Sequence, residues 1–366
     1  WYELQSAQIR IKEAEALEKE KHADRVNGKK IGRPKQYKSK LSKSITNEVK
    51  LQTVAYNNAR QRLPKDLIHL VYDRSRNFGK MDSESWYGMR TYITDGTCLQ
   101  LQDTEDIKGE YPVTKENGAY PQALLQVLIR QGGGQVWDCA LGNRKISELE
   151  LVIPMLDKLA SGSLLLADDL YNCYYLFWLI LNHNSHMIVP GKRERNYTVV
   201  KEITNKDLIV KIAKGRRPAC VNKEEWDTVP ESLILRRITY EYPTKNGMET
   251  AVLYTTITDE STDAVSIVQK YEKRWDMEIS IREIKTLMDI NVLRSKSCEM
   301  LKKELKVALT AYNMVRKIMA RAADKAAFPP ENNIFQKCAE AGSPAFLDRR
   351  GRVFCRVSTG RPRKTE

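Results

Sequence analysis

The spacing of hydrophobic and polar positions changes several times along this 366-residue chain. Residues 2–25 are densely charged and helix-prone, and the apolar spacing within 44–82 predicts two more helices, Val49–Arg62 and Leu67–Phe78. From residue 90 onward, short apolar runs alternate with amphipathic stretches, which is the order of elements in an α/β fold. We therefore expect a helical N-terminal region followed by a mixed sheet flanked by helices.

The predicted sheet begins at residue 90. Its expected strands are Arg90–Asp95, Ala123–Arg130, Gln135–Leu141, Ser163–Asp168 and Met187–Val189, with helices at Ile146–Ala160 and 172–183. Gly132-Gly133-Gly134 predicts a hairpin turn, and no Gly-Lys-Ser/Thr follows it, so it is not a phosphate loop and nothing here implies ATP. Asp95 and Asp168 each end a predicted strand, and open α/β sheets place their chemistry at the C-terminal ends of strands.

The pattern after residue 192 is different. Alternating segments predict the strands Tyr197–Ile203, Leu208–Ala213, Leu233–Tyr242 and Glu249–Thr258, and basic residues are frequent along them. Helices are expected at about 261–288 and 299–322, while 325–366 is poorly periodic. This order predicts a basic, β-rich module between the sheet and the closing helices.

The stretch Tyr271–Lys285 carries an unusual set of side chains. In a helix that turns about 100° per residue, Tyr271, Arg274, Glu278 and Lys285 fall within an arc of about 60°, with Arg282 at its edge. A carboxylate among cations and a phenol suits a divalent metal ion beside a phosphate. Arg–Glu pairs on a solvated helix face are the alternative, and the stretch alone does not decide between them.

Charge narrows the possible partners. The formal net charge is +14, which favours a polyanion, with nucleic acid the first candidate and an anionic membrane the second. The basic run 28–43 contains Gly32-Arg33-Pro34; it could follow phosphates or enter a minor groove, or it could be a solvated linker. The longest apolar run, near Tyr174–Leu181, is too short to span a bilayer.

The seven cysteines indicate the compartment. They are scattered without Cys-x-x-Cys or zinc-like spacing, which is typical of reduced thiols in a cytoplasmic protein. The chain begins at Trp1 and not at methionine, which leaves a truncated N-terminus open.

Three acids stand out as candidate metal ligands: Asp95, Asp168 and Glu278. Carboxylates without histidine favour Mg²⁺ or Mn²⁺ over zinc. Two such ions about 4 Å apart can activate a water or sugar hydroxyl in phosphoryl transfer. Each aspartate taken alone is equally compatible with a strand-end cap or a turn.

Four motifs in order resemble one family. They are Asp95-Gly-Thr with Asp103-Thr; Leu164-Leu-Leu-Ala-Asp168 with Tyr171-x-Cys-Tyr-Tyr; Tyr271-x2-Arg274-x3-Glu278-x6-Lys285; and Arg294-Ser-Lys-Ser-Cys-Glu-Met with Lys303-Glu-Leu and Ala311-Tyr-Asn-Met-Val-Arg316. Together they resemble the insertion-sequence-four family of bacterial DDE transposases over roughly residues 85–325.

The resemblance implies a ribonuclease-H-like α/β core with a β-rich insertion. It implies cut-and-paste transposition, with nicking at the element ends, a hairpin intermediate and transfer of 3′ hydroxyls to target DNA. It also implies double-stranded DNA as the partner, a homodimer in the synaptic complex, two Mg²⁺ or Mn²⁺ ions and no nucleotide cofactor. The expected location is the bacterial cytoplasm, at the nucleoid and not in a membrane.

The resemblance also assigns site residues. Carried over by position, Asp95, Asp168 and Glu278 are the metal ligands. By the same carry-over, Tyr271, Arg274 and Lys285 contact the DNA backbone. Arg282, at the edge of the same helix face, and Arg33, in the basic run, are further expected DNA contacts. Trp226 is the candidate for stacking on a flipped base, although a tryptophan in that context is more often buried. Asp169 stands where relatives often have a basic residue, so the second ligand is either Asp168 or Asp169.

The expected domains follow from this resemblance and from the changes of pattern along the chain. They are 1–82, helical and basic; 83–192, the first part of the core; 193–258, the insertion; 259–325, the core helices with Glu278; and 326–366, a basic tail. Two other functions are compatible with the sequence: an inactive relative that only binds DNA, and a metal-dependent nuclease that does not join strands.

Overall fold

The computed structural model describes residues 54–77, 85–113, 120–192, 195–244, 247–326, 345–347 and 353–355, without the side chains of 276–279, 286–287, 322–326, 345–347 and 353–355. The predicted helix at 2–25, the basic run with Arg33 and the final residues of the chain lie outside this set. The chain divides after Leu67 into two compact units, and the sheet belongs to the second. No helix in the described ranges has the length and apolarity that crossing a membrane requires.

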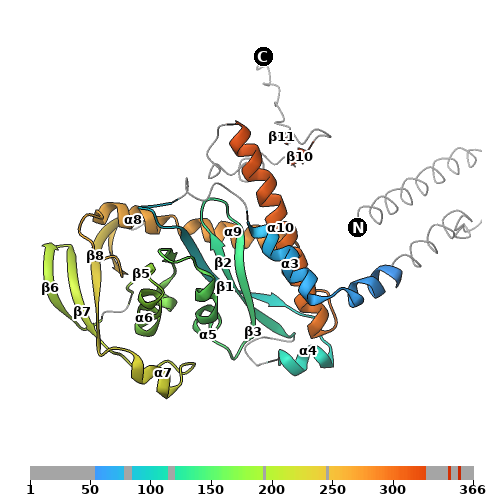
Figure 1. Ribbon diagram of the computed structural model, residues 1–366, viewed down its shortest axis with the longest axis horizontal. Coiled ribbons are helices and arrows are strands. Elements are labelled where there is room, and N and C mark those ends of the chain that lie inside the picture. The colour runs from blue at the N-terminus through green and yellow to red at the C-terminus, as the bar shows by residue number, and fades with distance from the viewer. Residues whose placement is uncertain are drawn as a thin grey trace, which may run out of the picture. The chain divides into compact units, whose positions relative to one another are not determined.

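The second unit is organised around one nine-stranded mixed sheet (Figure 1). Its strands are β1 (Thr91–Gln100), β2 (Gln122–Arg130), β3 (Val136–Asn143), β4 (Leu164–Leu166), β5 (His186–Pro190), β6 (Tyr197–Thr204), β7 (Asp207–Ala213), β8 (Ser232–Thr244) and β9 (Gly247–Thr255). The order is β3-β2-β1-β4-β5-β9-β8-β7-β6. β2 and β3 form an antiparallel meander with β1, whereas β4 and β5 run parallel to β1. The first five strands therefore have the ribonuclease-H-like arrangement, and the expected fold class is confirmed.

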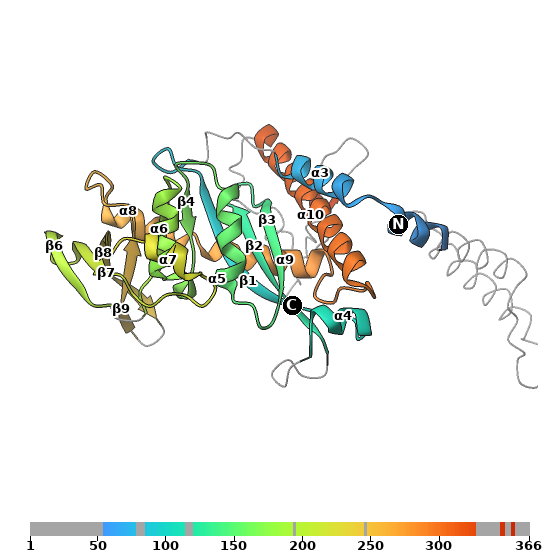
Figure 2. The same ribbon diagram turned by 60° about the horizontal axis from the view of Figure 1, so that its bottom comes forward.

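Helices cover both faces of the sheet (Figure 2). They are α3 (Lys65–Arg76), α4 (Glu105–Glu110), α5 (Glu148–Val152), η2 (Ile153–Lys158), η3 (Asp169–Tyr171), α6 (Tyr174–Asn182), α7 (Lys223–Thr228), α8 (Ala264–Glu272), α9 (Trp275–Leu287) and α10 (Cys298–Ala326). Leu164 and Leu166 of β4 pack with α8, α9 and α10, while Leu165 packs with α5, η2 and α6. All three leucines are fully buried, as the uniformly apolar run predicted.

Strand β1 corrects one prediction about Asp95. The expected strand ended at this aspartate, but β1 continues to Gln100, and Asp95 lies in its middle. The strand continues because β2 pairs with the whole C-terminal half of β1, from Asp95 opposite Val127 to Gln100 opposite Gln122. Strand β4, the neighbour on the other side of β1, has only three residues and ends before the level of Asp95. The acid is therefore at the end of the neighbouring strand and not of its own.

Two predicted helices are each divided. The expected helix Ile146–Ala160 changes at residue 153 from α5 to the 3₁₀ helix η2, because Pro154 has no amide hydrogen to continue the α-helical pattern. The expected helix 261–288 is wrong as a single element. It ends at Glu272, and a turn closed by the Arg274 amide on the Tyr271 carbonyl (2.8 Å) separates α8 from α9.

The two helices contact different strands. Helix α8 packs on β5 whereas α9 packs on β1, two strands away in the sheet. The single-helix face predicted for Tyr271, Arg274, Glu278 and Lys285 is corrected accordingly: Tyr271 belongs to α8 and the other three to the start and body of α9.

The β-rich stretch extends the central sheet. Strand β9 pairs antiparallel with β5, and β8, β7 and β6 follow as a meander. The four strands correspond to the four predicted ones, while α7 between β7 and β8 was not predicted. At the far end of the chain, the described strands β10 (Ala345–Leu347) and β11 (Val353–Cys355) pair antiparallel.

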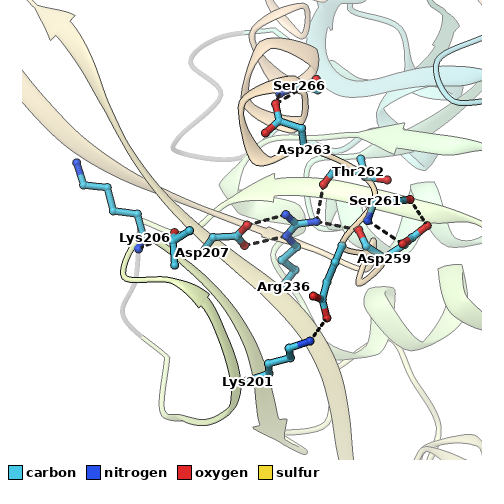
Figure 3. A network of polar contacts seen from close by, with 11 residues as sticks. Lys201, Lys206, Asp207, Arg236, Asp259, Ser261, Thr262, Asp263 and Ser266 are labelled. Atoms are coloured by element: carbon cyan, nitrogen blue, oxygen red, sulfur yellow. Dashed lines mark hydrogen bonds and ion pairs between the residues drawn. The ribbon is translucent and has the colours of Figure 1, made fainter.

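A buried ion pair holds this extension to the loop before α8 (Figure 3). Arg236 on β8 donates to both carboxylate oxygens of Asp207 on β7, at 2.8 and 2.6 Å. Its remaining nitrogen donates to the carbonyls of Asp259 and Thr262, at 3.0 and 2.8 Å. The guanidinium is fully enclosed, so Arg236 is a structural cation and not part of a DNA-facing basic surface.

Candidate active site

The register of the sheet brings Asp95 and Asp168 side by side. Ile93 on β1 pairs with Leu166 on the parallel strand β4, so the residues two positions further on are Asp95 and Asp168. Both residues are half-buried. The two acids, 73 positions apart in the sequence, are therefore neighbours at the open end of β4.

Asp95 lies in an environment that disfavours its charge. Burial, together with the charges of Asp168 and Glu148, raises the pKa of Asp95 to about 6, while the Gly96 amide and Arg274 act in the opposite direction. The Gly96 amide donates to Asp95 Oδ1 at 2.8 Å. Carboxylates held together in this way repel one another, and a bound cation would relieve the repulsion.

A divalent ion with a preference for oxygen fits this pair. Asp95 and Asp168 offer carboxylate oxygens, which suit Mg²⁺ and Mn²⁺. Among the side chains that the structure describes, no group of three or more His, Cys, Asp or Glu residues could hold a metal ion. That set does not include the Glu278 side chain, which would be the third ligand.

Asp168 and Asp169 have different surroundings. Asp168 caps η3, with its Oδ1 accepting from the Leu170 amide at 2.8 Å, and its charge acts on Asp95. Asp169 turns to the loop after β5, where its Oδ1 accepts from the Lys192 amide at 3.0 Å. The geometry favours Asp168 as the partner of Asp95.

Helix α9 is tied to β1 at one end and reaches Asp95 at the other. Its C-terminal continuation pairs with Gln100, whose amide donates to Asn291 and whose carbonyl accepts from Leu293, at 2.8 and 3.0 Å. At its start, the positive charge of Arg274 acts on Asp95. The backbone of Glu278 lies one turn after Arg274 in α9.

The predicted DNA contacts have distinct positions around Arg274. Its guanidinium lies 5.9 Å from the ring centres of both Tyr271 and Trp275. Burial raises the pKa of Tyr271 to about 12, which keeps the phenol protonated at neutral pH. Arg282 is exposed and Lys285 is half-buried, and both share the Glu278 face of α9 by helical spacing.

Trp226 lies in a different part of the unit. It is a half-buried residue of α7, packed against Tyr174 and Tyr175 with ring centres 6.3 and 6.2 Å away, and Lys214 Nζ is 5.0 Å from its ring. These contacts belong to the aromatic core on the α6 side of the sheet. Trp226 is thus not brought next to Arg274.

Two residues near the site were missed from the sequence. Trp275 is 62% exposed at the start of α9, unusual for an indole, and it stands next to Arg274. Glu148 on α5 lies close enough to Asp95 to affect its pKa. No local pattern singled out Glu148, because its neighbours at the site come from β1 and η3.

Comparison with known proteins agrees with this geometry. The family model described as "Transposase DDE domain" matches residues 86–314, more than half of the chain. The chain belongs to the DDE transposases. Members of this family generally use divalent metal ions, as the two adjacent acids indicate.

Individual proteins also resemble this DDE transposase, at low sequence identity. It is 25% identical over 292 residues to "Transposase InsG for insertion sequence element IS4" of Escherichia coli (strain K12), covering 76% of this chain. The chain spans 64% of the length of that relative. Among solved structures, the piggyBac transposase synaptic complex with hairpin DNA is 9% identical, with a TM-score of 0.39 over 64% of this chain and 48% of that one.

Proposed function

We propose that this DDE transposase catalyses cut-and-paste transposition of an insertion sequence. It nicks DNA at the element ends, releases the element through a hairpin intermediate and joins the 3′ hydroxyls to target DNA. The observation that carries the proposal is the pair Asp95 and Asp168 at the open end of β4, with α9 and its Glu278 tied along β1.

The three acids have one shared role in this proposal. Asp95, Asp168 and Glu278 would hold two Mg²⁺ or Mn²⁺ ions, which supply an activated hydroxyl and stabilise the charge on the departing oxygen. Asp95 lies on β1 and Asp168 follows the neighbouring strand β4, so strand pairing supports a fixed spacing of these two acids before DNA binds. Prepositioned charge of this kind lowers the barrier without reorganisation at the moment of reaction.

Cations beside the acids would position the DNA backbone. Arg274 is supported by Tyr271 and lies near Asp95, so we assign it to the phosphate next to the cut. Arg282 and Lys285 would contact phosphates further along the same face of α9, and Arg33 would follow the duplex outside the core. For base stacking, the exposed Trp275 is a better candidate than Trp226, because Trp226 is packed between other aromatic residues.

A strand-transfer assay tests the function. The full chain is incubated with DNA containing the element ends, a target plasmid and Mn²⁺. Hairpins and joined products are expected, since the proposal includes both steps. Nicks without joining would support the nuclease instead, and salt-sensitive binding without cleavage would support the DNA-binding relative. Two copies bridging two ends, measured by mass photometry, would support the synaptic homodimer.

Glu278→Gln separates catalysis from binding in the same assay. Glutamine keeps the size of the side chain but removes a charge that metal ions require, so cleavage should fall at least about 10³-fold while DNA affinity stays within about threefold. Glu272→Gln, an exposed acid at the end of α8, is the matched control and should cleave normally. Equal loss of binding and cleavage in Glu278→Gln would show that the residue is structural.

A further inference from the structure

A third carboxylate stands beside Asp95 from the opposite layer of the fold. Glu148 is the first residue of α5, a helix whose start is fixed by Ser147, the Oγ of which accepts from the Glu150 amide at 3.2 Å. Its carboxylate lies directly over Gly96: a Cβ on this glycine would be 2.3 Å from Glu148 Cδ. Glycine after Asp95 therefore leaves the space that Glu148 occupies.

A buried relay fixes the carboxylate in place. The Tyr171 hydroxyl donates to Glu148 Oε2 at 2.7 Å, and Gln126 Nε2 donates to the Tyr171 hydroxyl at 2.7 Å. Gln126 Nε2 also donates to Thr94 Oγ1 at 2.7 Å, next to Asp95 in β1. Gln126, Tyr171 and Thr94 are completely buried, so the relay is shielded from water and its hydrogen bonds reinforce one another.

The relay uses Glu148 as a hydrogen-bond acceptor. Burial and the charge of Glu148 raise the pKa of Tyr171, so the phenol stays protonated and donates. Only Oε2 is used: among the described residues, Oε1 of Glu148 has no hydrogen-bond partner. The structure thus holds the Glu148 carboxylate against Gly96, next to Asp95, with only one of its oxygens engaged by the described residues.

This placement is unfavourable in the absence of a cation. Glu148 is one of the charges that disfavour ionised Asp95, and a third acid also repels DNA phosphates. A relay that immobilises such a charge is explained if a divalent ion binds there, because the ion reverses the sign of all these interactions.

We propose that Glu148 is a positioning residue for the divalent ion of Asp95 and Asp168, strengthening its binding from beside the three family ligands. The inference rests on the proposed function because it requires a metal ion bound by Asp95 and Asp168. Groups in the shell around the ligands of a metal typically contribute about 10- to 100-fold to its affinity. Tyr171 and Gln126 act through Glu148 by holding its orientation.

The test is Mn²⁺ binding to the full chain without DNA, measured by isothermal calorimetry. Glu148→Gln should weaken binding at least about 10-fold. Glu150→Gln, an exposed acid two positions further along α5, changes the net charge equally and should bind like the wild type. Near-ultraviolet circular dichroism confirms that each variant is folded. An affinity of Glu148→Gln equal to that of Glu150→Gln would overturn the proposal.

A second variant covers the case in which Glu148→Gln does not fold. Gly96→Ala adds only a methyl group, and the atoms it meets are the carboxylate of Glu148, which must leave its hydrogen bond to Tyr171 to make room. It should lose Mn²⁺ affinity as Glu148→Gln does. Wild-type affinity in a folded Gly96→Ala protein would count against the inference.

Failure of this inference is distinguishable from failure of the proposed function. If Asp95→Asn abolishes Mn²⁺ binding and Glu148→Gln does not affect it, the inference is wrong and the metal site stands. If Glu148→Gln weakens Mn²⁺ binding but the wild type neither cleaves nor joins DNA, the inference stands and the proposed transposition is wrong.

Discussion

At the scale of single residues, Asp95 is an acid whose surroundings disfavour its ionised form. Its carboxyl is partly removed from water and faces two other acids, while only Gly96 and Arg274 stabilise the ionised form. Strain of this kind reduces stability, and functional sites are where proteins retain it. The loss is recovered when a cation binds, because binding to the folded state alone stabilises it.

Asp95 therefore predicts a pH-dependent effect of substitution. Its pKa is raised from 3.8 to about 6, so the folded state binds the proton more tightly, and ionisation lowers stability as pH rises from about 4 to about 6. Asp95→Asn removes this penalty and keeps an acceptor for the Gly96 amide. Without metal, the variant should be more stable than the wild type by about 1–2 kcal/mol at pH 7.5, and by almost nothing at pH 4.

Urea unfolding in EDTA at the two pH values measures this difference. Asp103→Asn, an exposed aspartate in the loop after β1, serves as the control and should show no comparable gain at pH 7.5. Adding Mn²⁺ should stabilise the wild type and not Asp95→Asn. A variant that is less stable than the wild type at pH 7.5 in EDTA would contradict the interpretation.

At the scale of elements, the buried cation Arg236 forms the joint, the set of hydrogen bonds that connects β7 and β8 to the loop before α8. Arg236 donates hydrogen bonds to both carboxylate oxygens of Asp207 and to the backbone carbonyls of Asp259 and Thr262 (Figure 3). These bonds connect the strands of the extension to the segment that leads into α8. Since α8 ends at the turn before Arg274, the joint helps to set where α9 begins.

Breaking this pair from one side should be strongly destabilising. Arg236→Met leaves Asp207 buried without a counter-charge and should lower the free energy of unfolding by about 3–5 kcal/mol. The double variant Arg236→Met/Asp207→Leu removes both charges and should recover most of that loss. The exposed pair Lys206–Glu241 provides the control, where Lys206→Met should change stability by less than about 1 kcal/mol.

Urea denaturation of the four proteins gives these values. If the double variant were as unstable as Arg236→Met, the bonds of Arg236 to the Asp259 and Thr262 carbonyls would be the main contribution instead of the ion pair.

At the scale of the whole molecule, a net charge of +14 sets how the protein meets DNA. The acids around Asp95 are a local negative site within a basic chain, so general attraction comes from lysines and arginines elsewhere. Binding of this kind releases counterions and weakens steeply with salt.

The salt dependence of DNA binding should therefore identify the cations on α9. If about six phosphates are contacted, affinity for duplex DNA should fall about 10³-fold between 50 and 200 mM salt. Arg282→Gln/Lys285→Gln should reduce the slope of log affinity against log salt by nearly 2, since each cation contributes about 0.9. Lys201→Gln/Lys206→Gln removes the same charge from exposed ion pairs and should change the slope less. Fluorescence anisotropy measures both; equal slopes for the two double variants would contradict a role of α9 in binding.

The sequence determined those features that depend on local spacing. The apolar run before Asp168 specified a strand buried on both faces, and Gly132-Gly133-Gly134 specified the turn between β2 and β3, where Gly132 and Gly134 adopt positive φ. The order of the elements, the fold class and the membership of the DDE transposases followed from such patterns and from four motifs. Periodicity is a property of neighbouring residues, so it can be recognised without a model of the whole.

Only the tertiary structure decided what depends on contacts between distant segments. The register of β1 with β4 places Asp95 beside Asp168, although Asp95 is not at a strand end. The predicted helix is divided before Arg274 into two helices that pack on different strands, and the relay that ends at Glu148 joins three elements that share no sequence motif. These features arise because strand pairing and side-chain burial are settled together across the whole sheet, and the spacing of residues along one segment does not encode them.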